Sequence, residues 1–93
     1  MNAVIVEVDA GGVDPETGHK NLRENIVPLV RQLPGFQSGT WLVATEDRKG
    51  FALVLFDTED NARAAAARFS VGANPQPGVT IERSEVREVA VTA

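Results

Sequence analysis

The sequence predicts an α+β fold whose elements follow the order β-α-β-β-α-β. Three observations carry this prediction: β-branched runs towards both ends of the chain, two helical patterns of apolar residues, and two β-rich runs joined by a short polar turn. The 93 residues are the length of one domain, so we expect a single domain over residues 1–93.

The first half of the chain predicts a strand, a loop and a helix. Val4–Val8 is a β-branched run typical of a strand, and the Gly-, Asp- and Pro-containing residues 10–19 favour a loop. From about residue 21 to 33, apolar residues recur at helical spacing: Leu22, Ile26, Leu29, Val30 and Leu33. Pro28 lies inside this pattern, and because the apolar stripe continues in phase across it we expect a kinked helix. Pro34-Gly35 then ends the helix.

The middle of the chain predicts an antiparallel hairpin. Residues 39–45 form the first β-rich run, the polar segment 46–50 forms the turn, and Phe51–Phe56 forms the returning strand. Two such runs joined by so few residues, one of them a glycine, are typical of a hairpin.

The last third of the chain predicts a second helix and a final strand. Thr58 is placed to cap a helix over about residues 59–70, whose apolar face is mostly alanine. The final strand runs from Val79 to about Val91, and its alternating pattern changes phase, which indicates a bulge near its middle. Right-handed β-α-β crossovers then place both helices on one face of a four-stranded antiparallel sheet, which is a ferredoxin-like arrangement.

The Phe51–Phe56 strand is apolar on both faces, which an isolated sheet with helices on one face does not require. An uncovered apolar face of this size exceeds what soluble monomers tolerate. We therefore expect a homodimer, the commonest way to cover such a face, with the C-terminal segment as the alternative cover. Which face of the strand meets the partner is left open. The interface candidates are the large residues of this strand: Phe51, Leu53, Leu55, Val54 and Phe56.

Composition excludes several classes of function. The net charge of −4 argues against a nucleic-acid or anionic-membrane surface, and the absence of cysteine removes disulfides and thiolate chemistry. The N-terminus has neither a basic segment nor a long apolar run, so we expect a cytoplasmic protein. Arginine outnumbers lysine and alanine and valine are frequent, which indicates a bacterial origin.

Four residues are candidates for a ligand pocket, and each also has a plain structural interpretation. His19 is the only histidine of the chain, the residue type most often used as an acid or base near neutral pH, and it could lie over a cleft, although a solvated loop histidine is the commoner case. Trp41 could stack an aromatic ligand, or it could pack in the core or an interface. Glu7 could act as a base, but an ion pair with Arg83 or Arg87 is favoured. Asn25 could face the cleft or, more commonly, solvent.

Nothing in the sequence indicates a cofactor or a metal site. The single histidine has no second histidine at ligand spacing, and no glycine-rich phosphate-binding motif occurs. We therefore expect neither.

The chain resembles the dimeric α/β-barrel superfamily, and within it the antibiotic-biosynthesis-monooxygenase-like proteins. The resemblance rests on the motifs Leu33-Pro34-Gly35-Phe36, Gly39-Thr40-Trp41 and the segment 54–60 that leads into an alanine-rich helix. It implies a homodimer in which two sheets pack face to face as a barrel, with a cleft between sheet and helices in each subunit. Some members are cofactor-independent oxygenases of aromatic polyketides, and others degrade haem.

This sequence departs from both activities. The second helix carries no histidine to bind haem iron, which argues against haem degradation, and the chain has no tyrosine. Three hypotheses follow: a protein that binds a small hydrophobic or aromatic molecule, a cofactor-independent monooxygenase-like enzyme, and a structural or regulatory homodimer without a ligand. Whether the protein is an enzyme is left open.

Overall fold

The computed structural model describes residues 1–44 and 46–93, and the predicted position of Thr45 at the end of a strand lies outside the described residues. The strands are β1 (Asn2–Asp9), β2 (Phe36–Val43), β3 (Lys49–Phe56) and β4 (Thr80–Glu88). The helical segments are α1 (Pro15–Asn21), a π-helical turn η1 (Leu22–Ile26), α2 (Val27–Arg31) and α3 (Glu59–Ala67).

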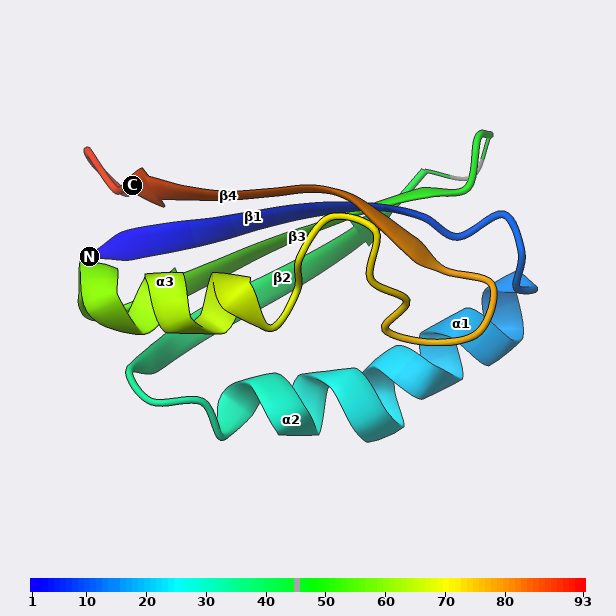
Figure 1. The fold of residues 1–93 in the computed structure, drawn as a ribbon, viewed down its shortest axis with the longest axis horizontal. Helices are drawn as coiled ribbons and strands as arrows, with labels where there is room; N and C mark the ends of the chain where they lie inside the picture. Colours follow the sequence, from blue (N-terminus) through cyan, green and yellow to red (C-terminus); the bar gives the residue numbers. More distant parts are fainter. Residues whose placement is uncertain (45) are drawn as a thin grey trace.

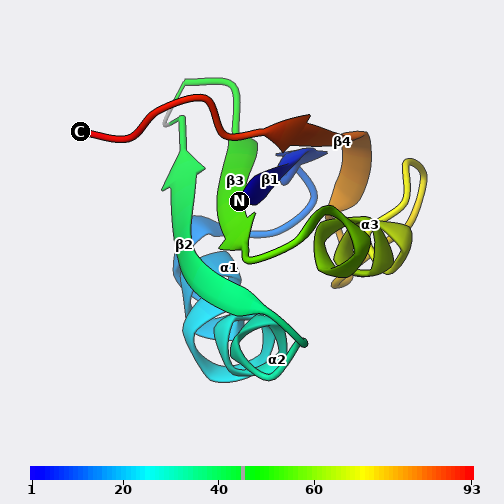
Figure 2. The same ribbon diagram turned by 90° about the vertical axis from the view of Figure 1, so that its left-hand side faces the viewer.

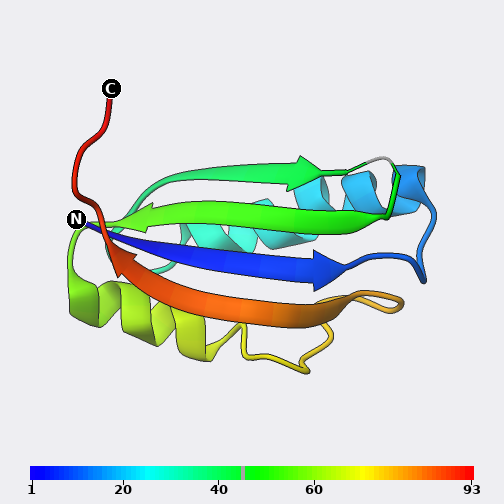
Figure 3. The same cartoon turned by 90° about the horizontal axis from the view of Figure 1, so that it is seen from above.

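The four strands form one antiparallel sheet in the order β2-β3-β1-β4. The helices cover one face of it (Figure 1), and the end-on view shows α2 beneath β2 and α3 beneath β1 and β4 (Figure 2). Seen from above, the opposite face carries no helix (Figure 3). This order and layering fit the ferredoxin-like fold expected from the sequence.

The core lies between the sheet and the helices. Alternate residues of the strands face the helices, and the core residues among them are Val4 and Val6 of β1, Val54 and Phe56 of β3, and Ile81 of β4. The helices contribute Val30, Leu33, Ala62 and Ala65. α3 packs its buried Ala62 and Ala65 against β1, β3 and β4, so its mostly alanine face is the one that meets the sheet.

The first helix begins earlier than expected. Residues 10–19 were predicted to be a loop, yet α1 starts at Pro15, and Asp14 caps it by accepting a hydrogen bond from the Thr17 N–H over 3.0 Å. Aspartate at the N-cap followed by proline at the first helical position is a helix start signal, and it outweighs the glycine content of this segment. His19 is therefore a helical residue.

The helix continues across Pro28 by widening into a π turn just before it. The Val27 N–H donates to the carbonyl of Leu22, a five-residue step, and the next residue is the proline, which has no N–H to donate. Leu22, Ile26 and Val30, on either side of this turn, line the space between the helix and the sheet. Leu29, expected in the buried stripe, is instead 41% exposed.

The remaining elements follow the sequence closely. β4 is shorter than expected at its C-terminal end, and its register against β1 shifts between Glu7 and Val8, which confirms the predicted bulge. α3 ends at Ala67, three residues before the expected end, and Thr58 caps it as predicted by accepting a hydrogen bond from the Asn61 N–H. β2 begins three residues before the expected start at residue 39, and β3 begins at Lys49, two residues earlier than expected, so the hairpin turn is shifted towards the N-terminus and not shortened.

Candidate functional site

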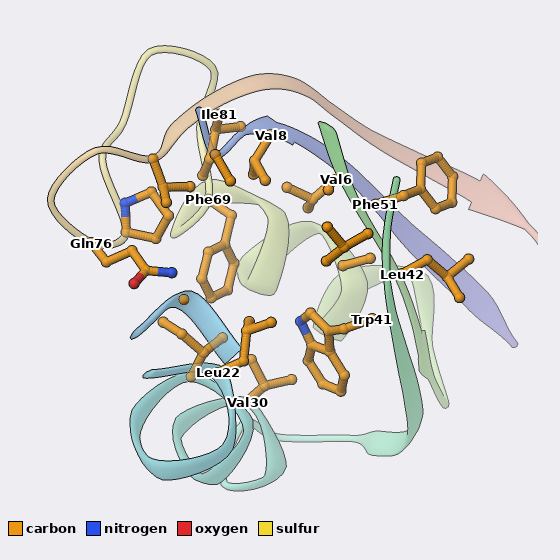
Figure 4. A pocket seen from close by; sticks show the side chains of 18 of the residues that line it. Val6, Val8, Leu22, Val30, Trp41, Leu42, Phe51, Phe69, Gln76 and Ile81 are labelled. Atoms are coloured by element: carbon orange, nitrogen blue, oxygen red, sulfur yellow. The ribbon is translucent and has the colours of Figure 1, made fainter. Parts of the chain in front are cut away.

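A cavity lies between the sheet and the first helix. The space in it open to the centre of a water-sized sphere is about 110 Å³. About 10–15 Å³ on this measure suffices for one water molecule, so the cavity has room for a group the size of a small ligand fragment. Figure 4 shows side chains from the sheet, the first helix and the segment after α3 facing this space, among them Val6, Trp41, Val30 and Phe69.

The wall of the cavity is almost entirely aliphatic and aromatic. β1 and β4 supply Val6, Val8 and Ile81, the helix supplies Leu22, Ile26 and Val30, and β3 supplies Ala52. An apolar cavity of this kind does not hold water well, because water finds no hydrogen-bond partners there. Atoms that line an empty space also lose dispersion contacts, which an apolar ligand would restore.

Trp41 is the aromatic wall of the cavity. It lies on the helix-facing side of β2, opposite Ala52 of β3, and its indole points towards Leu22 and Val30 (Figure 4). Of its two predicted roles, pocket wall and packing in the core, the structure combines both, since Trp41 also packs against the buried core.

The polar side chains of the wall are few: His19 of α1, Arg48 of the β2–β3 turn, Gln76 of the loop before β4, and the indole N–H of Trp41. His19 borders the cavity while its side chain remains exposed. It therefore lies at the entrance and not in the interior. Sequence analysis missed Arg48 and Gln76, because a basic residue in a polar turn and a glutamine between prolines are ordinarily solvated.

Two of the four pocket candidates lie elsewhere. Glu7 belongs to the opposite face of the sheet, and its Oε2 is 3.7 Å from Arg83 Nη2, which confirms the favoured ion pair. Asn25 is exposed on the π turn, where its amide donates to Asn21 Oδ1 over 2.6 Å. Neither contributes to the cavity wall.

The five interface candidates divide between the two faces. Val54 and Phe56 are 6% and 1% exposed on the face that the helices cover, so they belong to the core of the chain and are not available as surface for a partner. Phe51, Leu53 and Leu55 lie on the uncovered face, in register with Leu42, Thr40 and Ser38 of β2 and with Glu7, Ile5 and Ala3 of β1. Leu42 and Leu53 are 56% and 39% exposed. We call Ile5, Leu42, Phe51, Leu53 and Leu55 the open-face patch.

Charges flank the open-face patch on one side only. β4 places Arg83, Glu85 and Arg87 beside Glu7, Ile5 and Ala3 of β1. The Arg83 guanidinium lies 5.7 Å from the centroid of the Phe51 ring, close enough for a cation–π interaction. The patch therefore has an apolar centre over β3 and a charged border along β4.

The rest of the described chain offers little further chemistry. In residues 1–44 and 46–93, no group of three or more histidine, aspartate or glutamate side chains is placed to hold a metal ion. No helix among these residues is long and apolar enough to cross a membrane. A scan against protein-family models gave no match, and no curated protein matches the chain.

Proposed function

We propose that the protein binds a small hydrophobic or aromatic molecule in the cavity between its sheet and first helix. The observation that carries this proposal is the cavity of about 110 Å³ with an almost wholly apolar wall and Trp41 on one side. Ligand pockets are typically concave and mainly apolar, with a few polar groups that orient the ligand, and His19, Arg48 and Gln76 supply such groups.

The test uses Trp41, the only tryptophan of the chain, as the energy donor. N-phenyl-1-naphthylamine is neutral, apolar and an energy acceptor for tryptophan, so binding in the cavity should quench Trp41 and produce saturable probe emission. Ala52→Leu should weaken this binding about tenfold, because Ala52 faces Trp41 across the strands and a leucine there fills the space.

Ala64→Leu is the matched control, since Ala64 lies on the exposed side of α3 and does not line the cavity. It should bind the probe like the parent protein. Absence of saturable energy transfer in the parent, or equal affinities in the Ala52→Leu variant and the parent, would contradict the proposal.

The open-face patch supports a homodimer in which the uncovered sheet faces of two copies pack together. Leu53 is exposed at its centre on β3 and Leu42 at its edge on β2, and no described segment of the chain covers the patch. A two-fold axis would let each copy cover the apolar residues of the other, and this is the dimeric α/β-barrel arrangement expected from the resemblance.

A cofactor-independent oxygenase is the second candidate, and the position of His19 favours it. An aromatic substrate stacked on Trp41 would need a base to remove a phenolic proton before it reacts with oxygen, and His19 borders the cavity. Oxygen uptake with a panel of hydroquinones, lost in a His19→Gln variant that still binds the probe, would support this function. The absence of uptake with every member of the panel would contradict it.

A further inference from the structure

The polar groups of the cavity gather at one end of the molecule. His19 belongs to α1, Arg48 to the turn between β2 and β3, and Gln76 to the loop before β4. Figures 1 and 3 both place these three segments at the end of the sheet remote from the chain termini. The other end of the cavity, near Val30 and Leu33, is apolar. The cavity thus has a polar end and an apolar end.

Arg48 is held in place at the polar end. Its backbone adopts a φ of 60°, and its carbonyl accepts a hydrogen bond from the Ala10 N–H over 2.9 Å. Its guanidinium Nη2 donates in return to the carbonyls of Ala10, over 3.3 Å, and Val13. The hairpin turn and the loop after β1 are therefore tied together at this point, and the guanidinium is ordered before any ligand binds.

The charge of the Arg48 guanidinium is not neutralised by any described carboxylate. Its Nε is enclosed by the protein and, among the described residues, has no hydrogen-bond partner, which is uncommon for a buried polar group. No described carboxylate lies within ion-pair distance of it, and the cavity wall contains no aspartate or glutamate. Asp14 feels its charge, but the Asp14 carboxylate is engaged chiefly with Thr17 at the start of α1.

We propose that the ligand is an amphipathic carboxylic acid, with its apolar body in the cavity and its carboxylate on the guanidinium of Arg48. This inference rests on the proposed function, that is, on the cavity binding a ligand at all. A guanidinium presents several N–H donors in one plane and matches a carboxylate better than any neutral group. An apolar wall with a single anchored cation at one end selects a molecule that is apolar along its length and anionic at one terminus.

The test compares octanoate with octanol, two chains of equal length that differ in the terminal group, by isothermal titration calorimetry at pH 7. Octanoate is ionised there and should bind the parent protein about tenfold more tightly than octanol, as expected for a charge-assisted hydrogen bond. Arg48→Asn should remove this preference and leave octanol affinity within about twofold, since asparagine tolerates a positive φ. Arg31→Asn, an exposed arginine at the end of α2, is the charge-matched control and should retain the preference.

The outcomes separate the two proposals. Octanol binding as tightly as octanoate to the parent, or an unchanged preference in the Arg48→Asn variant, would overturn the acid and leave the cavity proposal standing. Binding of neither compound by a protein that does bind N-phenyl-1-naphthylamine would likewise overturn the acid, whereas binding of none of the three would overturn the proposed function itself. If Arg48→Asn fails to fold, the test rests on the affinities of the parent protein for octanoate and octanol, together with those of Arg48→Lys. This variant keeps the charge and should keep a preference for octanoate.

Discussion

The indole of Trp41 lies directly over Gly39, two residues earlier on β2. A Cβ atom on Gly39 would lie 2.7 Å from both Cζ3 and Cη2 of Trp41, closer than van der Waals contact permits. The missing side chain of Gly39 is therefore what allows the ring to lie flat along the strand and form the wall of the cavity.

Gly39→Ala should push the indole out of this position. Because the added methyl group overlaps the ring, we expect a loss of about 1–3 kcal/mol in the free energy of unfolding and a shifted Trp41 emission spectrum. Urea titrations and fluorescence spectra of the two proteins measure both effects. An unchanged spectrum with unchanged stability would show that the ring does not depend on Gly39.

Gly18→Ala should have the opposite effect on stability. Gly18 is buried within α1, and a Cβ there would meet only Val13 Cγ1, at an ordinary contact distance of 3.5 Å. Alanine restricts the unfolded chain and suits a helix better than glycine, so the free energy of unfolding should rise by about 0.4–1 kcal/mol. Urea titration is again the measurement, and a destabilised variant would contradict the packing described around α1.

Stability should fall at both extremes of pH. The Gly11 N–H and then Lys49 lower the pKa of Asp9, and the hydrogen bonds with Thr17 lower the pKa of Asp14, both from an ordinary 3.8. A carboxylate whose pKa is lowered by folding stabilises the folded protein above pH 3.8, and this stabilisation is lost as the pH falls below that value. The ion pair with Glu82, followed by Asp9, raises the pKa of Lys49 from 10.5, so its contribution is present below that pH and is lost at higher pH.

The Asp14→Asn variant measures how much Asp14 contributes to the loss of stability at low pH. Asparagine still caps the helix but does not titrate, so the decline in the urea midpoint from pH 5 to pH 3 should be shallower in this variant than in the parent. If the urea midpoints of the two proteins fall in parallel with pH, Asp14 does not contribute to the loss of stability at low pH.

Leu53→Glu should dissociate the proposed homodimer. The parent should sediment at about twice the monomer mass of 9.9 kDa, and a carboxylate in the centre of the open-face patch should give monomers because it would be buried unpaired. Leu29→Glu is a close control, since Leu29 on α2 is 41% exposed and Leu53 is 39% exposed. It should remain dimeric. A parent protein that sediments as a monomer would refute the dimer.

The sheet could be predicted from the sequence because its signals are local. The β-branched run of β1, the short polar turn of the hairpin and the capping threonine before α3 each act within a few residues. The change of phase in β4 also identified the bulge opposite Glu7. These features depend on backbone preferences, which a single sequence carries.

The direction of side chains on β1 was harder to predict. β1 is apolar on both faces, with Val4 and Val6 on one and Ala3 and Ile5 on the other, so alternation alone does not show which face the helices cover. Glu7 interrupts the apolar run of this strand and was considered for the cleft, and its pairing with Arg83 shows that it shares the face of Ile5.

The polar end of the cavity could not be predicted, because it depends on contacts between distant segments. Arg48 and Ala10 are far apart in the sequence and meet only when the β2–β3 turn lies beside the loop after β1. Nothing in the pattern around Arg48 distinguishes it from a solvated turn residue. Trp41 and His19 were found because each is the only residue of its type.

The most direct test of ligand binding in the cavity is a two-dimensional ¹H–¹⁵N spectrum recorded during titration with N-phenyl-1-naphthylamine. The probe is apolar, so it could also adsorb to the exposed open-face patch, and the spectrum separates the two sites residue by residue. We predict that the largest shifts will fall on the Trp41 indole N–H and on the amides of Leu22 and Val30, with Leu53 nearly unmoved. Shifts confined to Ile5, Leu53 and Leu55, none of which lines the cavity, would place the probe on the open face and contradict the account.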